Sequence, residues 1–177
     1  MKVLIFDTET TGLWSNTLIS LDKQPEIFDW FGLTFDTETH EVIDELQRYS
    51  KPYGKIEAGA SKATGKKDED FADYDRFEVS ANDIKQYIEG HDCCLAHNIV
   101  FDYEVTNFEM RRCGLIINWP PLIDSVEKSE WINGHRLSLT DLHVYLFGNK
   151  FEGAHESKTD VLALKDCWSE MIKRGWV

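Results

Sequence analysis

The chain begins with a short apolar run, KVLIF (residues 2–6), that leads directly into two acidic residues, Asp7 and Glu9. A run this short and this apolar predicts an interior strand of a sheet. Side chains alternate along a strand, so two carboxylates spaced two residues apart point to the same face. Two carboxylates that close together are a natural site for a divalent metal ion. The stretch therefore predicts a buried strand with a candidate metal site at its end.

The pentapeptide that contains these acids, FDTET, occurs a second time as residues 35–39. There it joins two β-rich runs that predict a hairpin, residues 26–35 and 41–49. A carboxylate at the tip of a hairpin points into water and needs no partner. We therefore do not expect Asp36 or Glu38 to be metal ligands.

The first copy runs instead into Thr11-Gly12-Leu13, a turn at which the backbone can approach a ligand closely. This makes Asp7 and Glu9 the better candidates for chemistry. Two solvated acids at the end of a strand would explain this stretch equally well, so further ligands are needed to decide.

Helices and strands are predicted to alternate behind the hairpin. After a loop-rich stretch at residues 50–80, the expected elements are a helix at 81–89, a strand at 92–97, a helix at 99–112, a strand at 122–125 and helices at 137–148 and 157–174. Three leading strands followed by alternating helices and strands predict an α/β fold, a mixed β-sheet flanked by helices. With 177 residues, the chain is expected to form one domain, residues 1–177.

Composition narrows the cellular setting and the class of partner. No apolar run approaches the roughly 20 residues of a membrane span, and the first residues do not resemble a signal peptide. A cytoplasmic protein with no membrane partner is therefore expected. The formal net charge of −13 argues against a protein that wraps long nucleic acid with a basic surface. It leaves room for an enzyme that holds the end of a strand through metal ions.

Lysine and cysteine are the other residue types that bear on binding. The main basic concentration lies in or beside one loop and is expected to be solvated; its members are Lys51, Lys55, Lys62, Lys66 and Lys67. The 4 cysteines form no C-x-x-C pair, so buried reduced thiols are expected and a zinc site is not.

Three segments, taken together and in order, resemble a known family. They are MKVLIFDTETTGL at the start of the chain, CCLAHNIVFD at residues 93–102 and AHESKTDVLAL at residues 154–164. These segments resemble the D-x-E, N-x-x-F-D and H-x-x-x-x-D motifs of the DEDDh family of 3′→5′ exonucleases, which includes the proofreading subunit of bacterial DNA polymerase III. The resemblance extends from residue 2 to about residue 165 and implies a ribonuclease H-like fold.

The resemblance also implies a catalytic centre with two divalent metal ions, Mg²⁺ or Mn²⁺. Asp7 would bridge both ions. Glu9 and Asp160 would hold the ion that binds the nucleophilic water, and Asp102 would hold the second ion. His155 would be the general base, because imidazole exchanges protons near neutral pH. Two such ions stabilise the attacking and leaving oxygens of a phosphoryl displacement, and the product would be a nucleoside 5′-monophosphate.

The other motif residues are implied to contact the substrate: Thr8, Thr11, Gly12, Leu13, His97, Asn98 and Phe101. Thr8, together with Glu9, would meet the terminal 3′-hydroxyl group. Leu13 would wedge against the terminal bases and Phe101 would stack nearby, which predicts little base preference. A place in the hydrophobic core would account for Leu13 and Phe101 equally well.

Structural roles remain open for several of these residues. Ser157-x-x-Asp160 has the spacing of a capping box, as Ser138-x-x-Asp141 has, so Asp160 has an alternative role as a helix cap. Asp102 has an alternative role as an acid that favours the positive end of a helix. His155 has an alternative role as a structural residue of a loop.

The function expected from the sequence is a metal-dependent 3′→5′ exonuclease that acts on single-stranded DNA ends. One alternative is an exoribonuclease similar to oligoribonuclease or ribonuclease T, with RNA as the partner. Another is a non-catalytic binding module that offers an acidic surface.

Two departures from the family affect partners and substrate contacts. Lys66 stands where proofreading subunits usually carry an apolar residue. The sequence also stops at Val177, without the extension through which the bacterial proofreading subunit binds its polymerase. A stable polymerase complex is therefore not implied, and both a monomer and a homodimer remain open.

Overall fold

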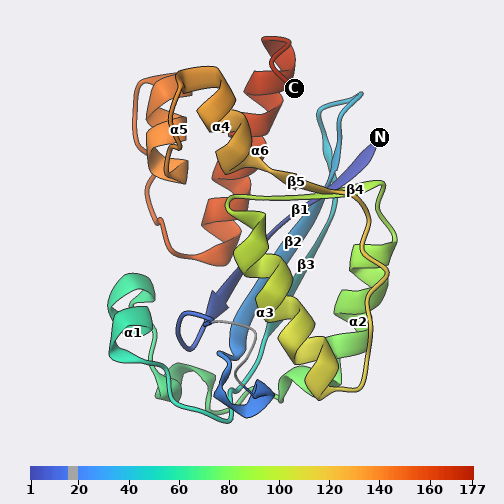
Figure 1. Cartoon of the computed structure of the whole chain (residues 1–177), viewed down its shortest axis with the longest axis vertical. Helices are drawn as coiled ribbons and strands as arrows, with labels where there is room; N and C mark the ends of the chain where they lie inside the picture. Colours follow the sequence, from blue (N-terminus) through green and yellow to red (C-terminus); the bar gives the residue numbers. More distant parts are fainter. Residues whose placement is uncertain (16–19) are drawn as a thin grey trace.

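The computed structural model describes residues 1–15 and 20–177. Its centre is a 5-stranded sheet in the order β3-β2-β1-β4-β5 (Figure 1). The strands are β1 (Lys2–Thr10), β2 (Ile27–Asp36), β3 (Val42–Tyr49), β4 (Cys93–Ala96) and β5 (Leu122–Asp124). β2 pairs antiparallel with β1 and β3, whereas β4 pairs parallel with β1 and β5. The predicted mixed sheet and its leading hairpin are confirmed.

Helices cover both faces of this sheet (Figure 1). The described helices are α1 (Ala58–Thr64), α2 (Phe77–Glu89), α3 (Ile99–Arg112), α4 (Ser125–Asn133), α5 (Leu139–Phe147) and α6 (Ser157–Lys173). α2 and α3 pack on one face, and α5 and α6 pack on the other. Short 3₁₀ turns lie at Leu21–Lys23 and Asp68–Phe71. Within the described ranges, no helix is long and apolar enough to cross a bilayer.

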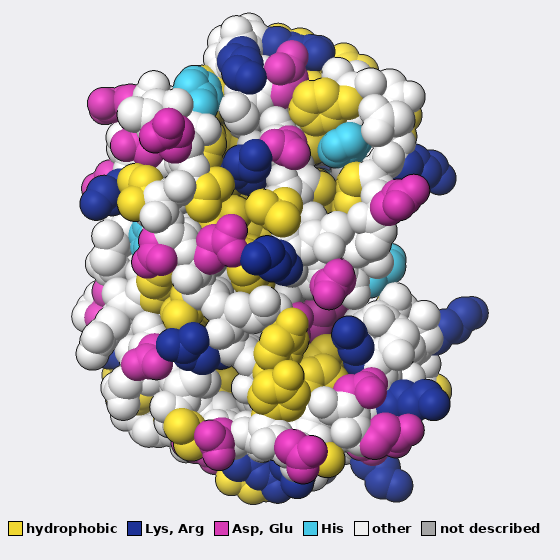
Figure 2. Space-filling view, turned by 180° about the vertical axis from the view of Figure 1, so that it is seen from behind, with side chains coloured by type: hydrophobic (Ala, Val, Ile, Leu, Met, Phe, Trp, Pro, Cys, Tyr) yellow, Lys and Arg dark blue, Asp and Glu magenta, His cyan; other side chains and the backbone are white. Residues whose placement is uncertain are grey.

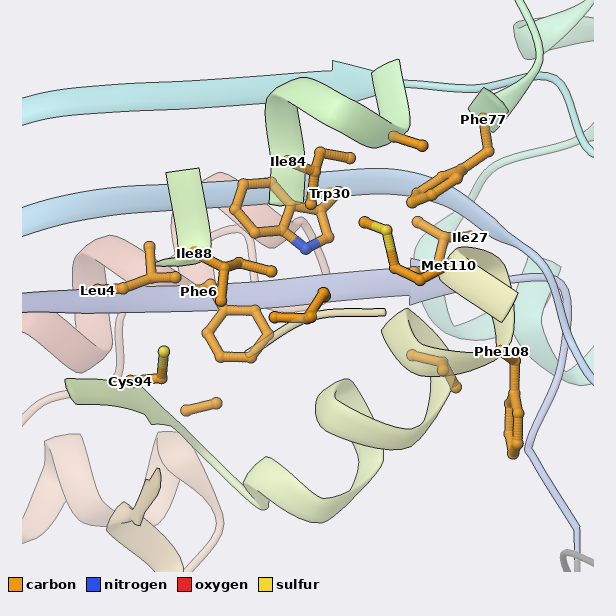
Figure 3. Packing of buried hydrophobic residues seen from close by; sticks show 14 of the residues in the cluster. Leu4, Phe6, Ile27, Trp30, Phe77, Ile84, Ile88, Cys94, Phe108 and Met110 are labelled. Carbon is orange, nitrogen blue, oxygen red and sulfur yellow. The ribbon is translucent and has the colours of Figure 1, made fainter. Parts of the chain in front are cut away.

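The alternation of β1 divides the hydrophobic core into two layers. Leu4 and Phe6 point to one face, where they pack with Trp30 of β2 and with residues of α2 and α3 (Figure 3). Val3 and Ile5 point to the other face and pack with residues of α5 and α6. Since β1 has strands on both sides and a helical layer on both faces, its apolar residues are fully buried. This burial explains why the run contains almost no polar residue.

The expected strand that ends in Asp-x-Glu is confirmed: β1 continues to Thr10, because its backbone pairing with β2 extends past the acidic residues. Asp7 and Glu9 therefore lie inside a strand. The stretch at 50–80 is not only loop: it contains α1 and the first turn of α2, which begins at Phe77.

α4 is absent from the sequence prediction altogether. Its sequence, SVEKSEWIN, lacks a regular apolar face, and the helix begins because the Asp124 side chain accepts a hydrogen bond from the Val126 N–H at 2.9 Å. The predicted cap at α5 is confirmed, since the Ser138 hydroxyl accepts from the Asp141 N–H at 3.1 Å. The cysteines are unpaired as expected, although Cys113 is only half-buried.

The second FDTET lies at the tip of the β2–β3 hairpin, as predicted. Asp36 pairs in register with Lys2, so it stands at the amino-terminal end of β1, at the opposite end of the strand from Glu9. The expectation that its carboxylate needs no partner is wrong. Asp36 accepts a hydrogen bond from the Glu38 N–H at 2.8 Å and lies 3.7 Å from the amino group of Met1, because the turn brings these groups to it. Its role is local to the hairpin.

Gly32 provides a test of the packing around Trp30. A Cβ atom at Gly32 would lie 2.7 Å from the Trp30 ring and 2.9 Å from the Leu4 side chain. We expect Gly32→Ala to lower the free energy of unfolding by about 1–3 kcal/mol, the usual cost of overpacking a core. Urea unfolding followed by circular dichroism would measure the change.

Gly59→Ala is the matched control, because no atom lies within 4 Å of a Cβ built at Gly59. This residue lies in the exposed helix α1, where alanine is favoured over glycine by roughly 1 kcal/mol. An unchanged urea midpoint for Gly32→Ala would contradict the packing described here.

Candidate active site

Three carboxylates meet beside the carboxyl-terminal part of β1. Asp7 and Glu9 continue the alternation of Val3 and Ile5, so they point to the face that α6 covers. Asp160 lies in the first turn of α6. One oxygen atom from each of the three carboxylates lies within 4.8 Å of the other two. The sheet and one helix thus bring together acids that are far apart in the sequence.

Asp102 reaches the same strand from the other face. Thr8 lies between the two acids of β1 and points toward α3, where Asp102 occupies the first turn. The Oδ1 atom of Asp102 accepts hydrogen bonds from the Thr8 N–H at 2.9 Å and from the Thr8 hydroxyl at 2.7 Å. Asp102 is therefore fixed next to the cluster without being one of its three closely spaced acids.

Burial raises the pKa values of these four acids, and repulsion within the cluster adds to the rise for Asp7 and Glu9. Burial, followed by the charge of Asp102, raises the pKa of Asp7 well above its ordinary value. Burial, followed by the charges of Asp160 and Asp29, raises the pKa of Glu9 to about 8. Burial raises the pKa of Asp102 to about 7 and that of Asp160 to about 6, although hydrogen bonds act in the opposite direction. Without a cation, the cluster retains protons near neutral pH.

The donor atoms fit a hard divalent cation. The Oδ1 atom of Asp160 is buried and has no hydrogen-bond partner among the residues that the structure describes. Its other oxygen accepts from the backbone N–H of His155 at 3.1 Å. A buried carboxylate oxygen without a partner is costly, and a cation beside it would remove that cost. Oxygen ligands suit Mg²⁺ or Mn²⁺ better than they suit metals that prefer sulfur.

Two cavities flank the cluster. The larger, of about 440 Å³, extends from Glu9 to α1, and its walls include Leu13 and Phe101. Leu13 is 83% exposed, so a place in the hydrophobic core does not account for it. Phe101 is half-buried and packs against the core as well as lining the cavity. The smaller cavity, of about 330 Å³, lies on the side of Asp7, Asp160 and His155.

The turn after β1 builds one wall of the larger cavity. Thr11 is buried, and its carbonyl oxygen accepts a hydrogen bond from the Glu57 N–H at 2.8 Å. A Cβ atom at Gly12 would lie 2.6 Å from the carboxyl carbon of Glu57, so only glycine leaves room for that side chain. Thr11 thus fixes the Glu57 backbone beside the turn, and Gly12 leaves room for the Glu57 side chain.

The two predicted substrate contacts near α3, His97 and Asn98, differ in whether their side chains are already hydrogen-bonded. Both ring nitrogens of His97 are engaged, with the Ser125 hydroxyl at 2.8 Å and the Leu137 carbonyl oxygen at 3.1 Å. Burial lowers the pKa of His97. Asn98 has a positive φ of 70° at the start of α3 and is exposed. Both residues line the smaller cavity, and the Asn98 side chain makes no such bond to the residues that the structure describes.

His155 is exposed and has a positive φ of 71°. Its backbone is tied to Asp160, as described above, whereas its imidazole ring has no hydrogen-bond partner within the described part of the chain. The ring therefore stands at the rim of the smaller cavity without a group that fixes its orientation.

The capping role considered for Ser157 and Asp160 is wrong. α6 begins at Ser157 itself, and Glu156, the residue at its N-cap, makes no side-chain capping bond. The Ser157 hydroxyl instead donates a hydrogen bond to the Oδ2 atom of Asp29 at 2.7 Å. Asp29 and Glu57 are site residues that the sequence did not predict. Asp29 could be found only from the strand register, which places it directly opposite Glu9.

The lysines of residues 51–67 do not form a uniform basic surface. Seen from behind, basic side chains gather over the region of α1, with acidic side chains between them (Figure 2). Lys67, for example, lies 3.8 Å from Glu69, whereas Lys51 donates to the Ala72 carbonyl oxygen. Lys66 is half-buried and close enough to oppose the rise in the pKa of Glu9.

Comparison with known families gives one match that covers most of the chain. A family model described as an exonuclease, RNase T, matches residues 4–166. The PolC-type DNA polymerase III of Ureaplasma parvum is 28% identical over 172 residues, which cover 95% of this chain and 11% of that protein. The DNA polymerase III subunit epsilon of Treponema pallidum is 25% identical over 171 residues, which cover 94% of this chain and 74% of that protein. The chain thus spans only 8–11% of the length of the PolC-type relatives.

Solved structures share the fold at low sequence identity. Exonuclease I superposes with a TM-score of 0.80 and 20% identity, covering 97% of this chain and 41% of that chain. A 3′-exonuclease that recognises the 3′ end of a histone mRNA stem-loop superposes with a TM-score of 0.78 and 17% identity, covering 98% and 64%. A zinc-bound complex of Escherichia coli exonuclease I with single-stranded DNA gives 0.80 and 21%, covering 98% and 41%. These likenesses confirm the ribonuclease H-like fold.

The raised pKa values predict how stability depends on pH. An unfolded chain releases the protons of these acids near pH 4, whereas folding raises the pKa values of Asp102 and Glu9 to about 7 and 8. Between about pH 4 and pH 8 the folded chain therefore holds more protons than the unfolded chain, so raising the pH favours unfolding. In EDTA, the melting temperature should therefore fall as the pH is raised from about 7 to about 8. Differential scanning fluorimetry would measure it.

Glu109 lies outside the site, and burial raises its pKa to about 7. It therefore adds to the fall in melting temperature with rising pH. Asp7→Asn isolates the contribution of the cluster, because it removes one charge there and should make the fall shallower. Mn²⁺ should oppose the fall in the unmodified protein and have little effect in Asp7→Asn. A melting temperature that rises with pH in EDTA would contradict the electrostatics described here.

Proposed function

The chain belongs to the RNase T family of exonucleases, and from that premise we propose that it is a metal-dependent 3′→5′ exonuclease that releases nucleoside 5′-monophosphates from single-stranded DNA. The observation that carries the proposal is the convergence of three carboxylates beside a cavity of about 440 Å³. That volume lies within the range of small-molecule sites.

Each acid of the cluster has a part in holding the metal ions. Asp7, Glu9 and Asp160 would hold one ion, and Asp7 with Asp102 would hold the second. When bound, such cations neutralise the negative charge that develops during phosphoryl transfer. The bonds from Thr8 would keep Asp102 oriented, because they fix one of its oxygens and leave the other available.

His155 would act as the general base. It lines the same cavity as Asp7 and Asp160, and its ring is free to turn toward a water molecule there. A neutral imidazole would accept a proton from that water as the water attacks the phosphorus atom. The exposed position would then let the ring return the proton to solvent.

The larger cavity would hold the terminal nucleotide. Leu13 and Phe101 offer apolar surfaces on which a base can stack, and stacking of this kind tolerates every base. Glu57 and Gly12 line the same cavity and would limit the space beyond the terminal nucleotide, which would favour the end of a strand over an internal position. Asn98 would contact the phosphate region from the other cavity.

DNA is the favoured substrate because the relatives at 25–28% identity are DNA polymerase III components. RNA is the second candidate, supported by the structural neighbour that recognises the end of an mRNA stem-loop. Single-stranded DNA and RNA of the same sequence, each labelled at the 5′ end, would separate the two. A ladder that shortens from the 3′ end would show the direction, and the faster ladder would identify the preferred sugar.

The two copies of FDTET provide a matched pair of variants. Asp7→Ala removes an acid of the cluster and should abolish shortening of the labelled strand in Mg²⁺ or Mn²⁺. Asp36→Ala removes the corresponding acid of the second copy, at the other end of β1, and should leave the rate nearly unchanged. Equal losses in both variants would show that the wrong copy has been assigned. No shortening by folded, unmodified protein would favour a non-catalytic binding module.

The role of His155 is tested by His155→Asn, since asparagine tolerates a positive φ. The rate should fall by roughly 100- to 10,000-fold, the usual contribution of a general base. The variant should still bind Mn²⁺, as measured by calorimetry. His40→Asn is the control, because His40 is also exposed and has a φ of 59°. A rate within about threefold of the unmodified protein in His155→Asn would exclude His155 as the base.

A further inference from the structure

A fifth acid, Asp29, lies next to the cluster and has no part in the roles proposed above. It stands on β2 directly opposite Glu9 of β1. Opposite residues of an antiparallel pair point to the same face, and Phe31, two residues further along β2, packs in the layer of α5 and α6. Asp29 therefore points toward α6, and it is only 3% exposed.

Asp29 connects β2 to the first residue of α6. Its Oδ2 atom accepts from the Ser157 hydroxyl at 2.7 Å, and Ser157 is fully buried. Its Oδ1 atom accepts from the Gln47 side-chain amide at 3.1 Å, which in turn donates to the Tyr49 hydroxyl at 2.7 Å. The carboxylate thus uses both oxygens to join α6 to two neighbouring strands.

The position of Ser157 on α6 explains why its bond to Asp29 affects Asp160. Ser157 and Asp160 are three residues apart, so they lie on the same side of α6. The N-cap residue Glu156 makes no side-chain capping bond that would fix this end of the helix. The buried bond between Ser157 and Asp29 therefore helps to hold the first turn of α6 against the sheet, alongside the exposed contact in which Lys158 donates to Glu45 of β3 at 2.7 Å.

An acid is a poor choice here if stability alone is considered. Like charges directly opposite one another in a sheet are destabilising, and Glu9 is the residue opposite Asp29. Burial also raises the pKa of Asp29. A carboxylate can, however, accept from two donors at once with its two oxygens, which a hydroxyl group cannot do in this geometry.

We propose that Asp29 is a positioning residue, whose bond to Ser157 holds the first turn of α6 so that Asp160 meets Asp7 and Glu9 in the arrangement that binds a divalent ion. This inference rests on the proposed function. It concerns the affinity for the ion, which is measurable without turnover. Loss of an outer partner of a metal ligand commonly weakens metal binding by about 10- to 100-fold.

Calorimetric titration of the full chain with Mn²⁺ is the test. Asp29→Ala and Ser157→Ala should each weaken Mn²⁺ binding by about 10- to 100-fold, and the double variant should be no weaker than the worse of the two. Asp29→Asn keeps an oxygen that can accept from Ser157, so its affinity should stay within about threefold of the unmodified protein.

Ser80→Ala controls for the loss of a buried serine hydroxyl. Ser80 lies in α2, on the opposite face of the sheet, and its hydroxyl donates to the Phe77 carbonyl oxygen at 3.2 Å. This variant should bind Mn²⁺ as the unmodified protein does. A purely structural role for Asp29 would lower the melting temperature and leave the Mn²⁺ affinity of the folded protein unchanged, which would overturn the inference.

Three further outcomes separate this inference from the proposed function. If Asp29→Asn binds as weakly as Asp29→Ala, the charge of Asp29 and not its bond to Ser157 supports the ion, and the positioning role is wrong. If the unmodified protein binds no Mn²⁺, the proposed function itself fails and the inference fails with it. Normal Mn²⁺ binding by both Asp29→Ala and Ser157→Ala would overturn the positioning role alone.

Discussion

The antiparallel pairing of β1 with β2 is the interaction on which the rest of the structure depends. It buries the apolar half of β1 between two helical layers, and it continues without interruption past Asp7 to Glu9. Because the strand remains paired in register through Glu9, the same alternation that assigns Val3 and Ile5 to the α6 face assigns the two acids to it as well. The register of β1 against β2 therefore sets both the packing of the core and the position of the candidate site.

The acids of the site are also stabilised by the helices that approach them. Asp102 and Asp160 each lie in the first turn of a helix, α3 and α6. The amino-terminal end of a helix carries a partial positive charge, which favours a nearby carboxylate. These two helix ends offset part of the repulsion in the cluster. The remaining negative charge would favour the cations proposed to bind there.

The sequence was informative where a local pattern decides the structure. The apolar run before Asp7 and the periodic apolar face of α6 predict those elements correctly. α1 and α4 were not predicted because neither has a regular apolar face, and capping by Asp124 is what starts α4. The bond between Asp29 and Ser157 joins residues 128 positions apart, so no local pattern contains it. Candidate ligands were recognisable from motifs, whereas their supporting contacts depend on the tertiary fold.

One wall of the larger cavity has little contact with the core. α1 contains no buried residue, and the Glu57 N–H just before it donates a hydrogen bond to the carbonyl oxygen of Thr11, just after β1. A segment with so few buried contacts can open at a small fraction of the free energy of global unfolding. If the cavity holds the terminal nucleotide as proposed, its width would adjust to a purine or a pyrimidine while the carboxylate cluster, anchored on β1 and α6, stays in place. Tolerance toward the base and rigidity toward the phosphate would then reside in different parts of the same fold.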